Sequence, residues 1–117
     1  MKGRSTTKAQ RKFWNNLCET VGCIACRKEG RFNSYCLLHH IDGRTKPHAH
    51  WFCLPLCGPH HQDAGNGVIA VHPYKARFEE AYGKQIDLFA ECLELLAEVP
   101  QEALDVLARQ KTMEGKQ

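Results

Sequence analysis

The sequence predicts a small α+β fold in which two short strands and a helix surround metal-binding side chains, with further helices on both sides. The chain has 117 residues with 43% hydrophobic and 25% charged content, which suits a single core. Its seven cysteines are an odd number and mingle with seven histidines, a mixture that indicates metal ligation rather than a disulfide framework. Apolar periodicity near both ends of the chain indicates helices.

The first expected helix covers residues 7–21, with Thr6 or Thr7 as its N-cap and Gly22 as its end. Its apolar residues recur at every fourth position, so they share one face. The surrounding half of the chain is basic: residues 1–48 carry ten Lys and Arg against three Asp and Glu. A basic half suits phosphate contacts, and it suits a solvated surface equally well.

A strand, a loop, a second strand and a short helix are expected next. Residues 35–41 read as a strand that ends in two adjacent histidines, and residues 42–50 have the glycine, proline and polar content of a loop. Residues 51–56 form the second strand, and residues 57–64 begin a helical turn that glycines end.

Three more helices are expected over residues 73–82, 86–97 and 100–109, with Gly83 closing the first of them. The apolar stripe of the last two predicts a surface that covers the core or associates with another copy. The expected organisation is therefore one domain of 117 residues. It consists of a basic N-terminal helix (1–21), a metal-binding core (22–83) and C-terminal helices (84–117).

Two ligand pairs with two-residue spacers predict a structural zinc site. Cys23 and Cys26 form the first pair, and Cys57 and His60 form the second about thirty residues later. A two-residue spacer lets both ligands of a pair face one ion, and zinc prefers four such ligands in a tetrahedron. A Cys3His set leaves no coordination position for water or substrate, so this zinc would be structural.

Three further histidines flank these ligands: His39, His40 and His61. Neighbouring strand residues point to opposite faces, so the first two are expected to have different roles. One imidazole can bind a divalent ion together with His61, while the other accepts a proton from water as a general base. The alternatives are a second structural metal, or one ligand and one hydrogen-bonded core histidine.

The order of these motifs resembles that of the HNH endonucleases, which share a ββα-metal, treble-clef-like finger. The resemblance rests on the Cys-x-x-Cys pair, on Leu37-Leu38-His39-His40-Ile41 and on Leu54-Pro55-Leu56-Cys57-Gly58-Pro59-His60-His61. Within that group the chain is most similar to the phage recombination-enhancement, RecA-dependent nucleases. The likeness covers residues 22–83 and includes Phe78-Glu79-Glu80-Ala81-Tyr82-Gly83.

This resemblance implies that His40 is the general base and that His39 and His61 bind the catalytic metal, with the structural zinc on the four residues named above. HNH enzymes often have Asp where this chain has His39, so Mg²⁺, Mn²⁺ and Zn²⁺ all stay open as the catalytic ion. His72 is a further candidate ligand, and its alternative is a surface or hydrogen-bonded histidine.

The resemblance also implies a DNA substrate, RecA filaments as a partner, and a phage or prophage origin. The expected phosphate contacts lie in the loop and in the first helix: Arg44, Lys46, His48, His50, Lys8, Arg11 and Lys12. For His48 and His50 the alternative role is to orient the general base. No apolar run is long enough to predict a membrane span, which indicates a cytoplasmic protein. The alternative function is a zinc-binding adaptor for DNA or protein that lacks hydrolysis, and the oligomeric state stays open.

Overall fold

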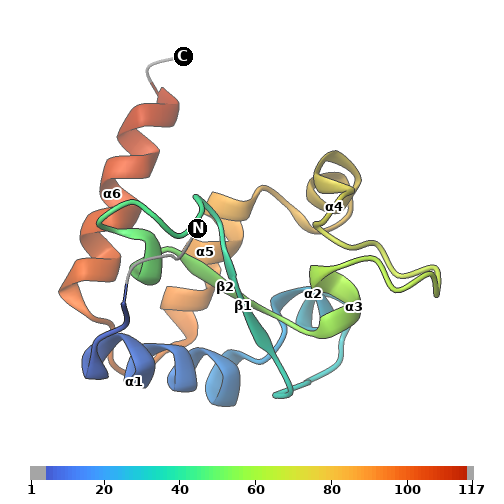
Figure 1. The fold of residues 1–117 in the computed structure, drawn as a ribbon, viewed down its shortest axis with the longest axis horizontal. Helices are drawn as coiled ribbons and strands as arrows, with labels where there is room; N and C mark the ends of the chain where they lie inside the picture. The colour runs from blue at the N-terminus through green and yellow to red at the C-terminus, as the bar shows by residue number, and fades with distance from the viewer. Residues whose placement is uncertain (1–4, 116–117) are drawn as a thin grey trace.

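The computed structural model describes residues 5–115 and has the α+β composition expected from the sequence (Figure 1). The two strands form a hairpin, and helices from both the N-terminal and the C-terminal parts of the chain pack against it. The elements in chain order are α1 (Lys8–Asn16), the π-helical turn η1 (Leu17–Val21), α2 (Ile24–Lys28), β1 (Leu37–His40), the 3-10 turn η2 (Ala49–Trp51), β2 (Cys53–Leu56), α3 (Gly58–His61), α4 (Lys75–Tyr82), α5 (Gln85–Leu95) and α6 (Gln101–Gly115).

The first helix begins where the sequence predicts and ends with a wider turn. Thr7 is its N-cap: the Gln10 amide donates to Thr7 Oγ1 at 3.1 Å, and the Thr7 amide donates to Gln10 Oε1 at 2.8 Å. The expected helix of residues 7–21 is divided into α1 and the π-helical η1. A regular helix has about 3.6 residues per turn, so apolar residues spaced four apart, such as Phe13, Leu17 and Val21, move gradually around its axis. The π-helical turn contains more residues, which keeps Val21 on the buried face.

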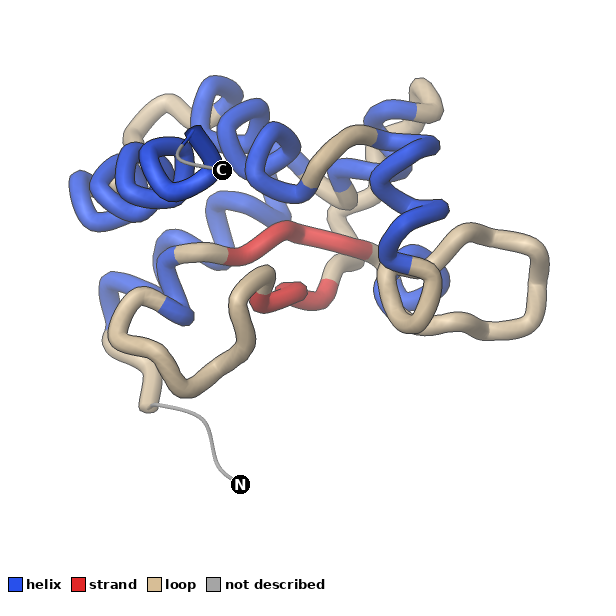
Figure 2. The backbone as a smooth tube through the Cα atoms, turned by 90° about the horizontal axis from the view of Figure 1, so that it is seen from above, coloured by secondary structure: helices blue, strands red, loops and turns tan. Residues whose placement is uncertain are grey.

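The two strands pair antiparallel, with His39 opposite Leu54 and His40 opposite Cys53. Both strands are shorter than expected. The second begins only at Cys53, because the 3-10 turn η2 extends as far as Trp51. All four residues of β2 are buried, and α5 packs against this strand. Figure 2 shows the strands in red with helices along one side of them.

The buried apolar side chains form a cluster to which all parts of the fold contribute. Its largest fully buried members come from α1 and η1, from β2, and from α4 and α5: Phe13, Leu17, Leu54, Leu56, Phe78, Leu88 and Phe89. The C-terminal helices therefore cover the core, which confirms one of the two roles expected for them. Helix α6 packs against α5 and continues beyond the expected end at residue 109, as far as Gly115.

Helix α2 was not expected from the sequence, which indicated only a pair of metal ligands there. It begins directly after Cys23, whose Sγ accepts a hydrogen bond from the Cys26 amide at 3.4 Å. A five-residue helix lacks the apolar period that would reveal it in a sequence. Within residues 5–115, no helix combines the length and the apolar character needed to cross a membrane.

Candidate active site

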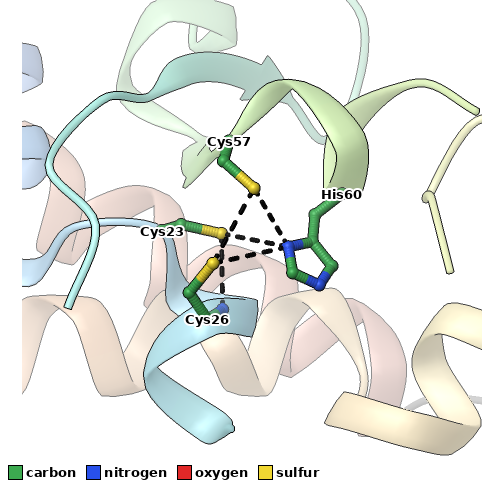
Figure 3. A group of neighbouring side chains, drawn as sticks. All are labelled: Cys23, Cys26, Cys57 and His60. Atoms are coloured by element: carbon green, nitrogen blue, oxygen red, sulfur yellow. Dashed lines mark hydrogen bonds between the residues drawn. The ribbon is translucent and has the colours of Figure 1, made fainter. Parts of the chain in front are cut away.

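The four expected zinc ligands meet at one buried point between α2 and α3 (Figure 3). Cys23 is the N-cap of α2, and Cys26 lies within that helix. Cys57 is the N-cap of α3, and His60 lies within it. The hairpin β1–β2 thus brings two short helices, about thirty residues apart in sequence, to the same place.

The distances within this cluster fit a tetrahedral zinc ion. Cys26 Sγ lies 3.8 Å from Cys57 Sγ, and Cys23 Sγ lies 3.6 Å from His60 Nδ1. Zn–S bonds of about 2.3 Å and Zn–N bonds of about 2.0–2.1 Å require ligand separations of roughly 3.8 and 3.5 Å. Burial raises the pKa of the Cys23 thiol to about 12, so a thiolate there needs a cation beside it. The cluster can therefore hold zinc, and four protein ligands leave no open position.

Tyr82 and Glu29 orient the His60 ring from the side that faces away from the cysteines. Its Nδ1 faces the cysteines, so Nε2 carries the proton and donates toward Tyr82 Oη at 3.1 Å. The Tyr82 hydroxyl donates in turn to the Glu29 carboxylate, and this bond lowers the pKa of Glu29. Such a chain fixes the tautomer and the ring orientation of a metal-binding histidine.

A second cluster consists of His39, His61 and His72, whose ligand atoms lie within 4.8 Å of one another. His39 comes from β1 and His61 from the end of α3. His72 comes from the segment before α4, where its backbone pairs with Gln62. His72, which was predicted as a further candidate ligand, therefore lies beside the two expected ligands. Its ring centroid is 4.9 Å from that of His39.

The nitrogen atoms of this cluster are suited to a metal ion. His61 Nδ1 is buried and has no hydrogen-bond partner among the described residues, which is costly for a polar atom unless a ligand meets it. Burial lowers the pKa of His39 to about 4, so its ring is neutral at pH 7 and offers a lone pair. Three histidines leave a coordination position open for water or substrate, as in catalytic sites.

His40, the expected general base, lies on the other side of β1 and belongs to a separate histidine pair. Its Nε2 is 3.0 Å from Nδ1 of His50, which is 5% exposed. The Trp14 indole donates to the His50 carbonyl at 2.8 Å, and its ring meets both histidines edge-on. Burial, followed by the charge of Arg44, lowers the pKa of His40 to about 4, so the ring can accept a proton at pH 7.

One cavity of about 560 Å³ joins both sets of histidines: His39, His40, His61 and His72 line it. Two cations, Arg44 and Lys75, line the same cavity, and neither forms an ion pair with an acid whose side chain is described. The two unpaired cations give the cavity a positive field. It can therefore receive a phosphate group next to a metal-binding cluster and a proton acceptor.

The comparison with known protein families agrees with these features. The family described as "recombination enhancement, RecA-dependent nuclease" matches residues 6–97, a stretch that contains every residue of both clusters. The chain belongs to this family of nucleases. This confirms the resemblance to the recombination-enhancement, RecA-dependent nucleases that the sequence motifs indicated.

The other residues expected to contact DNA in this RecA-dependent nuclease family member differ in their surroundings. Lys46 and His48 both bind the Asp42 carboxylate, at 3.0 and 2.9 Å. His50 is buried against His40, which favours the alternative that it orients the base. The basic residues of the first helix lie exposed on α1, which Trp14 connects to the His40 pair: Lys8, Arg11 and Lys12.

Two residues of the site were missed in the sequence. Lys75 lines the cavity, and its only signal is a basic side chain three residues after His72. Gln85 is 6% exposed and accepts a hydrogen bond from His39 Nε2 at 2.7 Å. A glutamine at the start of a helix has no sequence signal of this kind, so only the fold of the nuclease reveals the contact.

Proposed function

We propose that this chain is a metal-dependent DNA endonuclease of the HNH type, in which β1, β2 and α3 form a ββα-metal finger within one nuclease domain. The observation that carries the proposal is the single cavity in which an open three-histidine cluster lies beside a separate neutral histidine. Metal-assisted hydrolysis of a phosphodiester uses these two features, a cation site and a proton acceptor, at the same phosphate. Membership of a nuclease family supports this reading.

His39, His61 and His72 hold the catalytic cation in this proposal. The bound cation supplies Lewis acidity, because its charge offsets the negative charge that develops on the phosphate and the leaving oxygen. A site made of three imidazoles favours Zn²⁺ over Mg²⁺ and Mn²⁺, which prefer oxygen ligands. The Cys3His zinc has no open position and serves to hold α2 against α3.

His40 removes the proton from the attacking water. His40 Nε2 lies 3.0 Å from His50 Nδ1, so one of these two nitrogens donates to the other, and the neutral ring of His40 keeps one nitrogen lone pair that can take up a proton. The Trp14 indole in α1 donates a hydrogen bond to the His50 carbonyl, so α1 helps to hold His50 in contact with His40. The arrangement parallels other catalytic histidines, in which the second ring nitrogen bonds to a partner that fixes the tautomer.

Arg44 and Lys75 bind the scissile strand in this mechanism. Both line the cavity, and both are exposed without an acidic partner among the described side chains. A cation that is not already neutralised gains more from a phosphate than one that must first leave a carboxylate. The basic face of α1 extends the contact to phosphates farther along the strand.

Replacing His40 tests the proposal. The variant His40→Ala keeps its zinc and its fold but cleaves DNA roughly 10²–10⁴-fold more slowly, the usual contribution of a general base. The measurement is nicking of plasmid and of single-stranded DNA with Mg²⁺, Mn²⁺ or Zn²⁺, with and without RecA filaments. Lys111→Ala, on exposed α6, is the matched control and cleaves at the wild-type rate.

The outcomes separate the alternatives. Cleavage by the wild type and its loss in His40→Ala support the nuclease and the base, and an effect of RecA filaments supports that partner. Wild-type rates in His40→Ala would remove this residue as the base. If the wild type cleaves neither substrate under any of these conditions while it binds zinc and DNA, the chain is an adaptor instead.

A further inference from the structure

Helix α4 and the start of α5 carry a group of contacts that the proposed mechanism does not use. The segment Phe78–Gly83 was part of the family likeness, yet none of its residues lines the cavity. From this helix, Tyr82 reaches His60 of the zinc cluster, as described above. Glu79, one turn earlier, reaches the other cluster through an intermediate: its carboxylate accepts a hydrogen bond from Gln85 Nε2 at 3.3 Å.

The Glu79 contact decides which way the amide of Gln85 points. A carboxylate accepts hydrogen bonds and cannot donate one, so the NH₂ group of Gln85 must face Glu79. The amide oxygen then faces His39, whose Nε2 lies 2.7 Å from it. Because that oxygen only accepts, His39 carries its ring proton on Nε2. Its lone pair is on Nδ1.

We propose that Gln85, oriented by Glu79, is a positioning residue that fixes the tautomer and ring orientation of His39 for binding the catalytic cation. The inference rests on the metal site proposed above and adds residues to its support. A ligand histidine that donates its second nitrogen to a neighbouring oxygen is held in place and made a better ligand. Gln85 and His39 are both buried, 6% and 4% exposed, so water does not replace the bond.

The backbone explains how two helices supply this chain of contacts. Gly83 ends α4 with a φ of 116°, a conformation that favours glycine, and α5 begins two residues later at Gln85. The sharp corner folds the first residue of α5 back toward Glu79 in α4. One helix thereby contacts a ligand of each metal cluster, through Tyr82 on one side and through Glu79 and Gln85 on the other.

The test measures metal affinity directly. Protein that already carries one equivalent of zinc in the Cys3His cluster is titrated with Zn²⁺ against a competing chromophoric chelator. Gln85→Leu removes the amide while keeping a similar volume, and it weakens the second zinc by roughly 10–100-fold. The matched control is Gln62→Leu, because Gln62 also lines the cavity but makes no side-chain hydrogen bond to a described residue. The control keeps wild-type affinity.

A second variant excludes a merely structural role. The double exchange Gln85→Glu with Glu79→Gln restores both hydrogen bonds. The carboxylate at position 85 then accepts from His39, and the amide at position 79 donates to that carboxylate. It binds the second zinc at least as tightly as the wild type. The single variant Gln85→Glu sets two carboxylates side by side and binds less tightly than the double exchange.

The failures of the two proposals are distinguishable. If the wild type binds no second zinc, the proposed catalytic site is wrong and the role of Gln85 falls with it. If the wild type binds a second zinc and Gln85→Leu binds it equally well, only the positioning role is wrong. If Gln85→Leu weakens the second zinc and the double exchange does not restore the affinity, the positioning role is also wrong. Altered packing would then explain the loss of affinity.

Discussion

Two neighbouring cations in the loop between β1 and η2 differ in what they contact. Lys46 binds both carboxylate oxygens of Asp42 at 3.0 Å, whereas Arg44 lies near enough to lower the pKa values of His40 and His61 through its charge. In both histidines burial is the larger cause of the lowered pKa. Arg44 is therefore the better placed of the two for a phosphate in the cavity.

We expect Arg44→Ala to weaken DNA binding more than Lys46→Ala does. Each lost phosphate contact reduces the slope of log affinity against log salt by about 0.9 for duplex DNA and about 0.7 for a single strand. The measurement is the salt dependence of binding to one oligonucleotide by the wild type and both variants. Equal slopes in Arg44→Ala and the wild type would remove Arg44 from the phosphate contacts.

The sequence predicts the metal ligands better than it predicts the residues that hold those ligands in place. Cys26 and Cys57 were predicted as ligands because a two-residue spacer restricts the geometry within each pair, and the structure brings them to within 3.8 Å. The spacing cannot predict Gln85 or Lys75, because their positions depend on the corner at Gly83 and on the path of the segment before α4. The burial of His50 likewise depends on Trp14, which is 36 residues away.

The junction between η1 and α2 is the element on which the zinc cluster depends most directly. Gly22 has a φ of 70° and a ψ of −169°, a region that is essentially restricted to glycine. A Cβ there would lie 2.8 Å from the Asn33 carbonyl oxygen, which accepts the hydrogen bond of the Cys23 amide. The backbone at Gly22 thus holds the first zinc ligand in place.

Gly22→Ala and Gly30→Ala form a matched pair for this element. Gly30 also has a positive φ, 86°, but a Cβ added there meets nothing within 4 Å. We expect Gly30→Ala to cost about 1–2 kcal/mol of unfolding free energy, the cost of the backbone conformation alone. Gly22→Ala costs more, about 3 kcal/mol, because strain and the lost hydrogen bond add. Urea unfolding of the zinc-loaded protein measures both, and equal losses would contradict the role of the junction.

Most elements are predictable because each depends on local signals. The N-cap at Thr7 and the end at Gly22 are examples, and both agree with the structure. The errors have tertiary causes: the expected strand over residues 51–56 begins late because Trp51 is drawn into η2 and packs on Phe13. Helix α2 was missed because its stability comes from zinc ligands and from packing on β2 rather than from an apolar period.

For the whole molecule, the Cys3His cluster joins α2 to α3, two short helices about thirty residues apart in sequence. One ligand pair flanks α2 and the other flanks α3, and the hairpin lies between them in sequence. Zinc binding in small fingers supplies about 10–16 kcal/mol, which is comparable with the total stability of about 5–15 kcal/mol typical of a domain. The ion is therefore expected to decide whether the fold forms.

Removing zinc from the protein should then unfold it rather than only inactivate it. A strong chelator abolishes the cooperative unfolding transition followed by far-ultraviolet circular dichroism, and zinc added back restores it. Cys57→Ser, which lacks one thiolate, behaves like the chelated protein at equal zinc concentration. His72→Ala is the control, because it removes a ligand from the open cluster alone: it loses the second metal but unfolds with the wild-type midpoint. A chelated protein that keeps its cooperative transition would mean that the apolar cluster around Phe13, Leu54 and Phe89 suffices for folding, and that the zinc serves only to position α3.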